Sequence, residues 1–216
     1  MFHSCRRPPW SRGLLLLALL AGTASAAQTY RGFTIDESAV RKLPNLEAVL
    51  AATREQIDMV HDVGLSPDIL TFVEGVTFKL VPAGTFKGQT PGIYAGHRDS
   101  SVQVSTAIVA TGHKPVLLHE LMHAYHDQRL ERGFANLDIL AFYQSAQAIP
   151  SYAAKSHMMS NEKEFFACGA TAYLFGVTAQ EPFRREKIRE SQPDYYNYLK
   201  KLFGPDAGNH AGSLTR

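Results

Sequence analysis

The segment from residue 116 to residue 125 constrains the fold of this chain more than any other part of it. It contains His119, Glu120 and His123 in the pattern H-E-x-x-H. Two histidines four residues apart lie on one face of a helix, where their imidazole nitrogens can bind the same metal ion. Glu120 lies beside that face and can take a proton from a water on the metal. The motif therefore predicts a helix with a catalytic zinc site.

The residues on either side of the motif favour a buried helix. Glu120 is the only charged residue between 116 and 125, and the positions around it are Val, Leu, Met, Ala or Tyr. Charges close to the metal would be desolvated at a cost, so a catalytic helix needs this pattern. A surface helix with two incidental histidines would carry polar residues at Leu118, Leu121 and Met122. The apolar flanks favour the zinc-dependent peptidase interpretation.

The first 26 residues have the pattern of a signal peptide. Three arginines precede an apolar core at 14–21, and Ala24-Ser25-Ala26 is a small-residue cleavage site. The apolar run is too short to span a bilayer. We expect a mature chain of residues 27–216 that forms a single domain, with a flexible tail at about 204–216. It is expected to be exported to a periplasm or outside the cell, with no membrane attachment after cleavage.

Charge and cysteine content narrow the class of protein further. The chain has 22 basic and 20 acidic residues, and removing the three leader arginines leaves 19 basic residues. With no basic block, this balance argues against nucleic acid binding. Cys168 is the only cysteine after residue 26, so no internal disulfide can form in the mature chain. Such a domain must depend on its core, and a bound metal could stabilise it.

The hydrophobic pattern predicts an α+β domain of the zincin-like type. Strands are expected at 69–81 and 92–110, with 102–106 alternating as in a half-exposed strand. Helices are expected at 44–62, 136–148, 161–175 and 193–203, besides the motif helix. The sheet thus lies in the first half and most helices in the second. We expect residues 93–106 to supply an edge strand beside the motif helix, to which a peptide or protein substrate adds as an extended strand.

Two histidines leave a catalytic zinc site one protein ligand short. Metzincins supply a third histidine at a fixed distance after the motif. Here Arg129 occupies that position and His126 occupies the glycine position, which disfavours that class. An acid on the helix at 161–175 is the better candidate, and both Glu162 and Glu164 are available there.

The segment Asn161-Glu162-Lys163-Glu164-Phe165-Phe166-Ala167, taken with H-E-x-x-H, resembles the anthrax lethal factor-like zinc peptidases, which include the bacterial Pro-Pro endopeptidases. The resemblance covers about residues 116–175. It implies a site of the glutamate (gluzincin-like) type with Glu164 as the third zinc ligand, and Glu162 as the alternative.

The same resemblance implies an oxyanion donor a short distance before the acidic helix, where the family has a tyrosine. Tyr152 matches the residue type, whereas the family spacing selects His157. Either side chain can donate a hydrogen bond to an oxyanion, and Tyr152 could equally be ordinary packing.

Three further residues near the motif each have two interpretations. Cys168 lies one turn after Glu164, where the family often has an acid. It is interpreted as a buried, inert thiol or as a redox-sensitive thiol near the zinc. His126 and Asp127 are expected to be solvated positions at the end of the motif helix, although either could orient a metal ligand.

The sequence therefore predicts a zinc metalloendopeptidase. His119, His123 and Glu164 hold Zn²⁺, Glu120 is the general base, and Tyr152 stabilises the oxyanion. Two alternatives remain: a zinc hydrolase for another amide, such as a cell-wall peptide, and a non-catalytic binding module stabilised by zinc. The sequence does not specify the substrate.

Overall fold

The structure is a computed structural model, and part of the chain lies outside what it describes. The predicted signal peptide and nearly all of the predicted tail are outside it. The described residues are 27–88, 90–96, 99–150, 152–176, 184–205 and 207.

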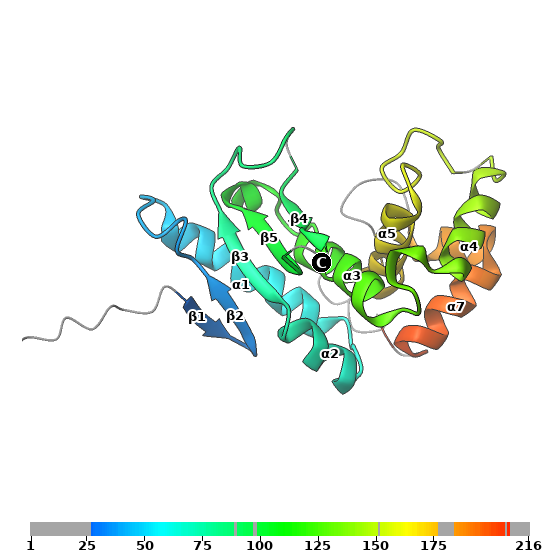
Figure 1. Cartoon of the computed structure of the whole chain (residues 1–216), viewed down its shortest axis with the longest axis horizontal. Helices are drawn as coiled ribbons and strands as arrows, with labels where there is room; N and C mark the ends of the chain where they lie inside the picture. Colours follow the sequence, from blue (N-terminus) through cyan, green and yellow to red (C-terminus); the bar gives the residue numbers. More distant parts are fainter. Residues whose placement is uncertain are drawn as a thin grey trace, which may run out of the picture.

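A five-stranded mixed sheet occupies one side of the molecule (Figure 1). Its order is β1 (Ala27–Tyr30), β2 (Phe33–Asp36), β3 (Thr77–Val81), β5 (Ser101–Ser105) and β4 (Gly92–Tyr94). The strands β2, β3 and β5 are parallel, whereas β1 and β4 pair antiparallel at the two edges. This arrangement confirms the expected small sheet in an α+β fold.

The edge strand beside the motif helix is β4, which is only three residues long. The predicted segment 93–106 is therefore divided between this edge strand and the interior strand β5. The alternation predicted for 102–106 is only partly present: Val102 and Val104 are buried and Gln103 between them is half-buried, but Ser105 is buried instead of exposed. Residues 106–110 form a 3-10 helix, η2 (Thr106–Ala110), and not the predicted continuation of the strand.

The helix α2 (Pro67–Glu74) occupies most of the first half of the segment predicted as strand at 69–81, so this part of the prediction was wrong. Its β-branched and aromatic residues favoured a strand. However, Pro67 stands in the first turn, where proline suits a helix. Ile69 and Val73 are four residues apart and both buried, as one helical face requires. Burial of that face outweighed the strand propensity.

The other helices follow their predicted positions closely. They are α1 (Leu46–Asp62), the motif helix α3 (Val116–Arg129), α4 (Leu137–Gln147), α5 (Glu162–Phe175) and α7 (Pro193–Phe203). A short helix that the sequence did not suggest, α6 (Arg185–Ser191), precedes α7. In the described part of the chain, no helix has the length and hydropathy to cross a membrane.

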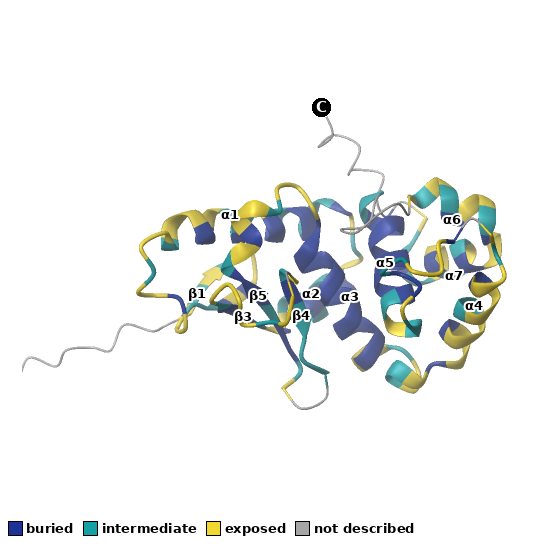
Figure 2. Cartoon of the chain, turned by 90° about the horizontal axis from the view of Figure 1, so that it is seen from above, coloured by how far each residue is buried: buried dark blue, intermediate teal, exposed yellow. Residues whose placement is uncertain are grey.

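The motif helix α3 runs through the middle of the molecule, between the sheet and the C-terminal helices (Figures 1 and 2). Every residue from Val116 to Asp127 is buried, as the apolar flanks predicted for residues 116–125. One face of α3 lies along β4 and β5, and another packs against α5. This burial carries the motif to the place where the two parts of the fold meet.

Candidate metal centre

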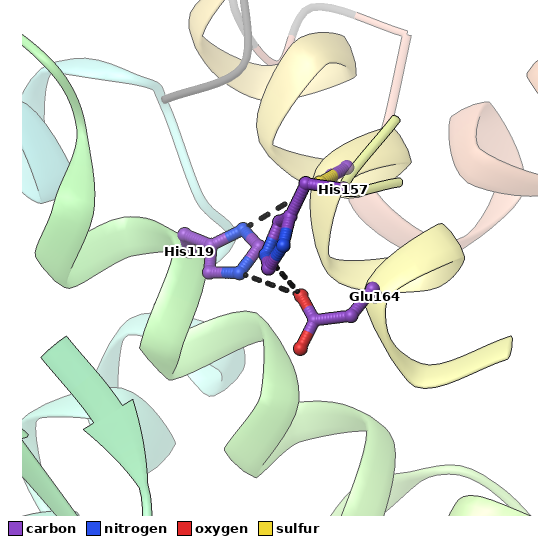
Figure 3. Close-up of side chains that lie close together, drawn as sticks. His119, His157 and Glu164 are labelled. Carbon is purple, nitrogen blue, oxygen red and sulfur yellow. Dashed lines mark hydrogen bonds and ion pairs between the residues drawn. The ribbon is translucent and has the colours of Figure 1, made fainter. Parts of the chain in front are cut away.

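The side chains of His119, His123 and Glu164 converge between α3 and α5. The Nε2 atoms of the two histidines lie 3.2 Å apart. The Glu164 Oε2 atom lies 3.2 Å from Nε2 of His119 and 3.3 Å from Nε2 of His123. Figure 3 shows the Glu164 carboxylate pointing at the His119 ring. The three atoms form a nearly equilateral triangle.

The first turn of α5 holds Glu164 in this place. The Asn161 side chain accepts hydrogen bonds from the backbone N–H groups of Lys163 and Glu164, each at 3.0 Å. This cap satisfies two of the N–H groups that a helix start leaves unpaired. A cavity opens beside these side chains. Of the two acids considered from the sequence, Glu164 lines this cavity, and Glu162 is not among its described lining residues.

The spacing of the three atoms fits a tetrahedral metal site. Zn–N and Zn–O bonds of about 2.0 Å place tetrahedral ligand atoms about 3.3 Å from one another. The observed separations of 3.2, 3.2 and 3.3 Å match this value. Two imidazoles and one carboxylate are also a donor set that suits Zn²⁺. The residues present therefore fit the metal.

A second set of potential donors overlaps the first. Ligand atoms of His119, His157, Glu164 and Cys168 all lie within 4.8 Å of one another. The Cys168 Sγ atom, however, lies 4.0 Å from Nδ1 of His119, on the side of the ring away from Glu164. An ion at Nδ1 of His119 beside Cys168 would differ from an ion at Nε2 beside His123 and Glu164, because one ion cannot bind both nitrogens of one ring. The triangle with His123 has the regular spacing of a metal site, and the set with Cys168 does not.

A cavity of about 480 Å³ opens beside the three donors. His119, Glu120, His123, His157 and Glu164 line it, together with β4 and residues on either side of that strand. His157 Nε2 also lies 2.8 Å from Oε2 of Glu164. The structure thus brings His157 into the site.

Tyr152, the sequence candidate for the oxyanion donor, occupies a different place. It is only 5% exposed and is not among the described residues that line the cavity. Burial raises the pKa of Tyr152 to about 12, so its hydroxyl stays protonated at neutral pH. Between the two candidates left open by the sequence, the cavity contains His157.

Burial dominates the electrostatics of the acids. Glu120 is 6% exposed, and burial, reinforced by the charge of Glu164, raises its pKa to about 7. Burial also opposes ionisation of Glu164, but hydrogen bonds with His119, His123 and His157 outweigh it and lower the pKa of Glu164. The two carboxyl groups therefore differ, as expected for a proton carrier beside a permanently charged donor.

Burial raises the pKa of the Cys168 thiol, with the nearby charges of Glu164 and Glu120 adding to the effect. A neutral, buried thiol is the inert form expected from the sequence.

The expectation that His126 and Asp127 are solvated was wrong. His126 is 0% exposed and lies between the rings of Phe134 and Phe166. Asp127 is 6% exposed and accepts a hydrogen bond from Tyr94 on β4. The sequence placed both near a helix end, but the 3-10 turn at 133–135 folds back and contacts the last turns of α3.

Gly92 is a site residue that the sequence did not indicate. A Cβ atom there would lie 3.0 Å from Cγ of Glu120, 3.2 Å from Oε1 of Glu120 and 3.1 Å from Cγ1 of Val116. The absence of a side chain lets β4 lie directly against the motif helix. Only the close approach of two segments distant in sequence makes this glycine necessary, so no local pattern could have revealed it.

Comparisons with known proteins support the fold. No protein family model matches this sequence, and no curated protein matches it. Among solved structures, the fold is similar to that of the Pro-Pro endopeptidase from Paenibacillus alvei, with a TM-score of 0.52 and 18% sequence identity. The match covers 78% of this chain and 97% of that chain. At this identity the likeness confirms the α+β, zincin-like fold, and the activity must be argued from the site.

Proposed function

We propose that this protein is a zinc-dependent endopeptidase that acts after export to a periplasm or outside the cell. The triangle of His119, His123 and Glu164 carries the proposal, because its spacing matches a catalytic zinc site. The similar fold of a Pro-Pro endopeptidase supports a peptidase, and the leader-like residues 1–26 support export.

His119 and His123 would hold Zn²⁺ through Nε2, and Glu164 through its carboxylate. Bound there, the metal would supply Lewis acidity toward water and toward a substrate carbonyl group. Glu120 takes the proton of the attacking water on its carboxylate and passes it to the leaving amine nitrogen. Burial keeps the pKa of Glu120 at about 7, where a carboxyl group can both accept and release a proton.

His157 is the donor that we propose for the oxyanion formed on the substrate carbonyl oxygen. Its ring lies in the cavity, and an imidazole carries an N–H group that can donate a hydrogen bond. The Tyr152 prediction is retained as the alternative, since its residue type matches the resembled family.

The substrate that we propose is an extended peptide added to the outer edge of β4. The Ser105 N–H donates to the Pro91 carbonyl oxygen, and the Ala95 N–H donates to the Ser101 carbonyl oxygen. Backbone groups alternate between the two sides of a strand, so those of Gly92 and Tyr94 face away from β5. The Tyr94 N–H faces the Glu120 carboxylate, which leaves the Gly92 groups and the Tyr94 carbonyl oxygen for an added strand. An added strand would bind this edge through backbone hydrogen bonds, beside the cavity that holds Glu120.

A zinc analysis followed by a peptide-library assay tests this function. We expect the purified mature chain to contain about one zinc and to cleave peptides, and Glu120→Gln to keep the zinc and lose cleavage. Full activity of Glu120→Gln would overturn the mechanism. Cleavage of cell-wall peptides alone would point to a different amide hydrolase. Zinc that stabilises the fold, with no hydrolysis of either substrate, would indicate a binding module.

A further inference from the structure

Tyr94 links the edge strand β4 to the motif helix through both its backbone and its side chain. Its backbone N–H faces the Glu120 carboxylate closely enough to lower the pKa of that group. Its hydroxyl group donates to Oδ2 of Asp127 at 2.8 Å and accepts from Nε2 of Gln128 at 2.9 Å. One residue of the edge strand therefore contacts both the proposed general base and the last turns of the same helix.

The spacing along α3 explains how one residue reaches both places. Asp127 follows Glu120 by seven residues, which is two helical turns, so both lie on the same face of α3. The Tyr94 side chain spans these turns, and its ring packs edge-on against Phe134 at a centroid distance of 6.2 Å. Because Asp127 is 6% exposed, its bond with Tyr94 is shielded from water, where hydrogen bonds to charged groups are strongest.

Gly92 is a second residue of β4 that contacts α3 near Glu120. It lies against Val116 and Glu120, closely enough that a Cβ atom would crowd the Glu120 side chain. The Glu120 carboxylate is therefore confined by Gly92 and by the N–H of Tyr94, both on a strand of three residues. The strand β4 lies at the edge of the sheet, so β5 is its only neighbour there. Its contacts with α3 therefore add to its pairing with β5 in fixing its position.

We propose that Tyr94 and Asp127 are positioning residues, whose hydrogen bond holds β4 against α3 and thereby fixes the Glu120 carboxylate in the cavity. Asp127 is not among the described residues that line the cavity, and the Tyr94 hydroxyl is turned to Asp127. The hydrogen bond acts through the backbone of β4, so its loss lets the strand and Glu120 shift together. This proposal rests on the proposed peptidase function. It adds that the strand which receives the substrate also sets the place of the general base.

The other edge of the sheet provides a matched control. There the Tyr30 hydroxyl of β1 donates to Asp58 of α1, at 3.1 Å to Oδ1 and 3.2 Å to Oδ2. Tyr30 and Tyr94 thus each tie an edge strand to a helix through a tyrosine–aspartate hydrogen bond, but only Tyr94 is beside the cavity. Tyr30→Phe removes the same chemical group far from Glu120.

The test compares Tyr94→Phe, Asp127→Ala, their double variant and Tyr30→Phe in the zinc-loaded protein. We expect Tyr94→Phe to lower kcat about tenfold with KM changed less than about twofold and zinc content unchanged, because a small misplacement of a catalytic group costs rate. The double variant should lose no more than the worse single variant. Asp127→Asn, which keeps an acceptor oxygen, should recover most of the rate, and Tyr30→Phe should match the wild type.

Hydrogen exchange of the β4 amides gives a second readout that needs no substrate. We expect faster exchange of the Tyr94-position amide in Tyr94→Phe and Asp127→Ala than in Tyr30→Phe. Unchanged kcat, or unchanged exchange at β4, would overturn the proposal. If the wild type cleaved no peptide while the exchange result held, the proposed peptidase function would be wrong. The Tyr94–Asp127 hydrogen bond would then hold β4 against α3 as a property of the fold alone.

Discussion

The Nε2 atom of His119 lies 3.2 Å from the Oε2 atom of Glu164, although 45 residues separate them along the chain. The contact spans the interface between α3 and α5, the most closely packed pair of helices in the described structure. Both side chains come from well-fixed places: His119 from a buried helix, and Glu164 from a first turn that Asn161 caps. A metal site assembled in this way is held ready for its ion.

Replacing Glu164 by Gln tests whether its charge is needed for metal binding. We expect zinc affinity, measured by competition with a chromophoric chelator, to fall by more than about 100-fold, because ligand carboxylates contribute more than the residues that orient them. Glu162→Gln is the control, since it removes an acid from the same helix turn without changing the cavity lining. Equal losses in the two variants would contradict the assignment of Glu164.

Removing zinc should destabilise the protein measurably. If zinc binds only the folded chain, a concentration 100-fold above its Kd adds about 2.7 kcal/mol to the free energy of unfolding. For a chain of this size that corresponds to a Tm increase of about 5–10 °C. Scanning calorimetry with and without a chelator measures the shift. His123→Ala should show no zinc-dependent shift, and a full shift in that variant would exclude His123 as a ligand.

The identity of the oxyanion donor can be read from two variants. We expect His157→Ala to lower kcat by about 100-fold with zinc retained, as for loss of one oxyanion donor elsewhere. Tyr152→Phe should have a much smaller effect on kcat, because its hydroxyl is buried away from the cavity. Zinc content is measured beside the rate, since His157 also contacts Glu164. The reverse order of losses would restore Tyr152 as the donor.

His126 should make the fold sensitive to acid. Burial, with smaller contributions from His123 and Lys163, lowers the pKa of His126 to about 3. In the unfolded chain His126 has its ordinary pKa of about 6.5. At a pH between 6.5 and 3, His126 is therefore protonated in the unfolded chain and neutral in the folded chain, so the free energy of unfolding falls as the pH falls. Between pH 7.5 and pH 5 this group alone should remove about 2 kcal/mol from the free energy of unfolding.

Urea unfolding of the zinc-free protein at the two pH values measures this effect. The control is His126→Phe, which keeps a ring between Phe134 and Phe166 but cannot titrate. We expect the variant to lose about 2 kcal/mol less than the wild type over this interval. An identical pH dependence in both proteins would show that His126 does not titrate between the folded and unfolded states.

The sequence predicted the features that repeat with a clear period. The helices around 46–62, 116–129, 162–175 and 193–203 have apolar positions at helical spacing or clear caps, such as Asn161 and Gly176. Two corrections came from tertiary packing. Residues 69–74 are helical despite their β-branched composition, and Ser105 of β5 is buried although the alternation predicted it to be exposed.

The candidate site was predictable only where its residues share a helix. His119, Glu120 and His123 follow one another at helical spacing, and the acid on α5 came from resemblance. The contacts of β4 could not be predicted, because Tyr94 and Asp127 are 33 residues apart and nothing local marks either as a partner. Choosing between Tyr152 and His157 likewise required the path of a loop that has no regular period.

The position of a bound zinc ion shows whether His119, His123 and Glu164 are its ligands. Crystals of the zinc-loaded mature chain, measured at the zinc absorption edge, locate the ion by its anomalous signal. We predict one peak within about 2.2 Å of Nε2 of His119, Nε2 of His123 and the Glu164 carboxylate. A peak bound instead through Nδ1 of His119 and Sγ of Cys168, or no peak between α3 and α5, would contradict it.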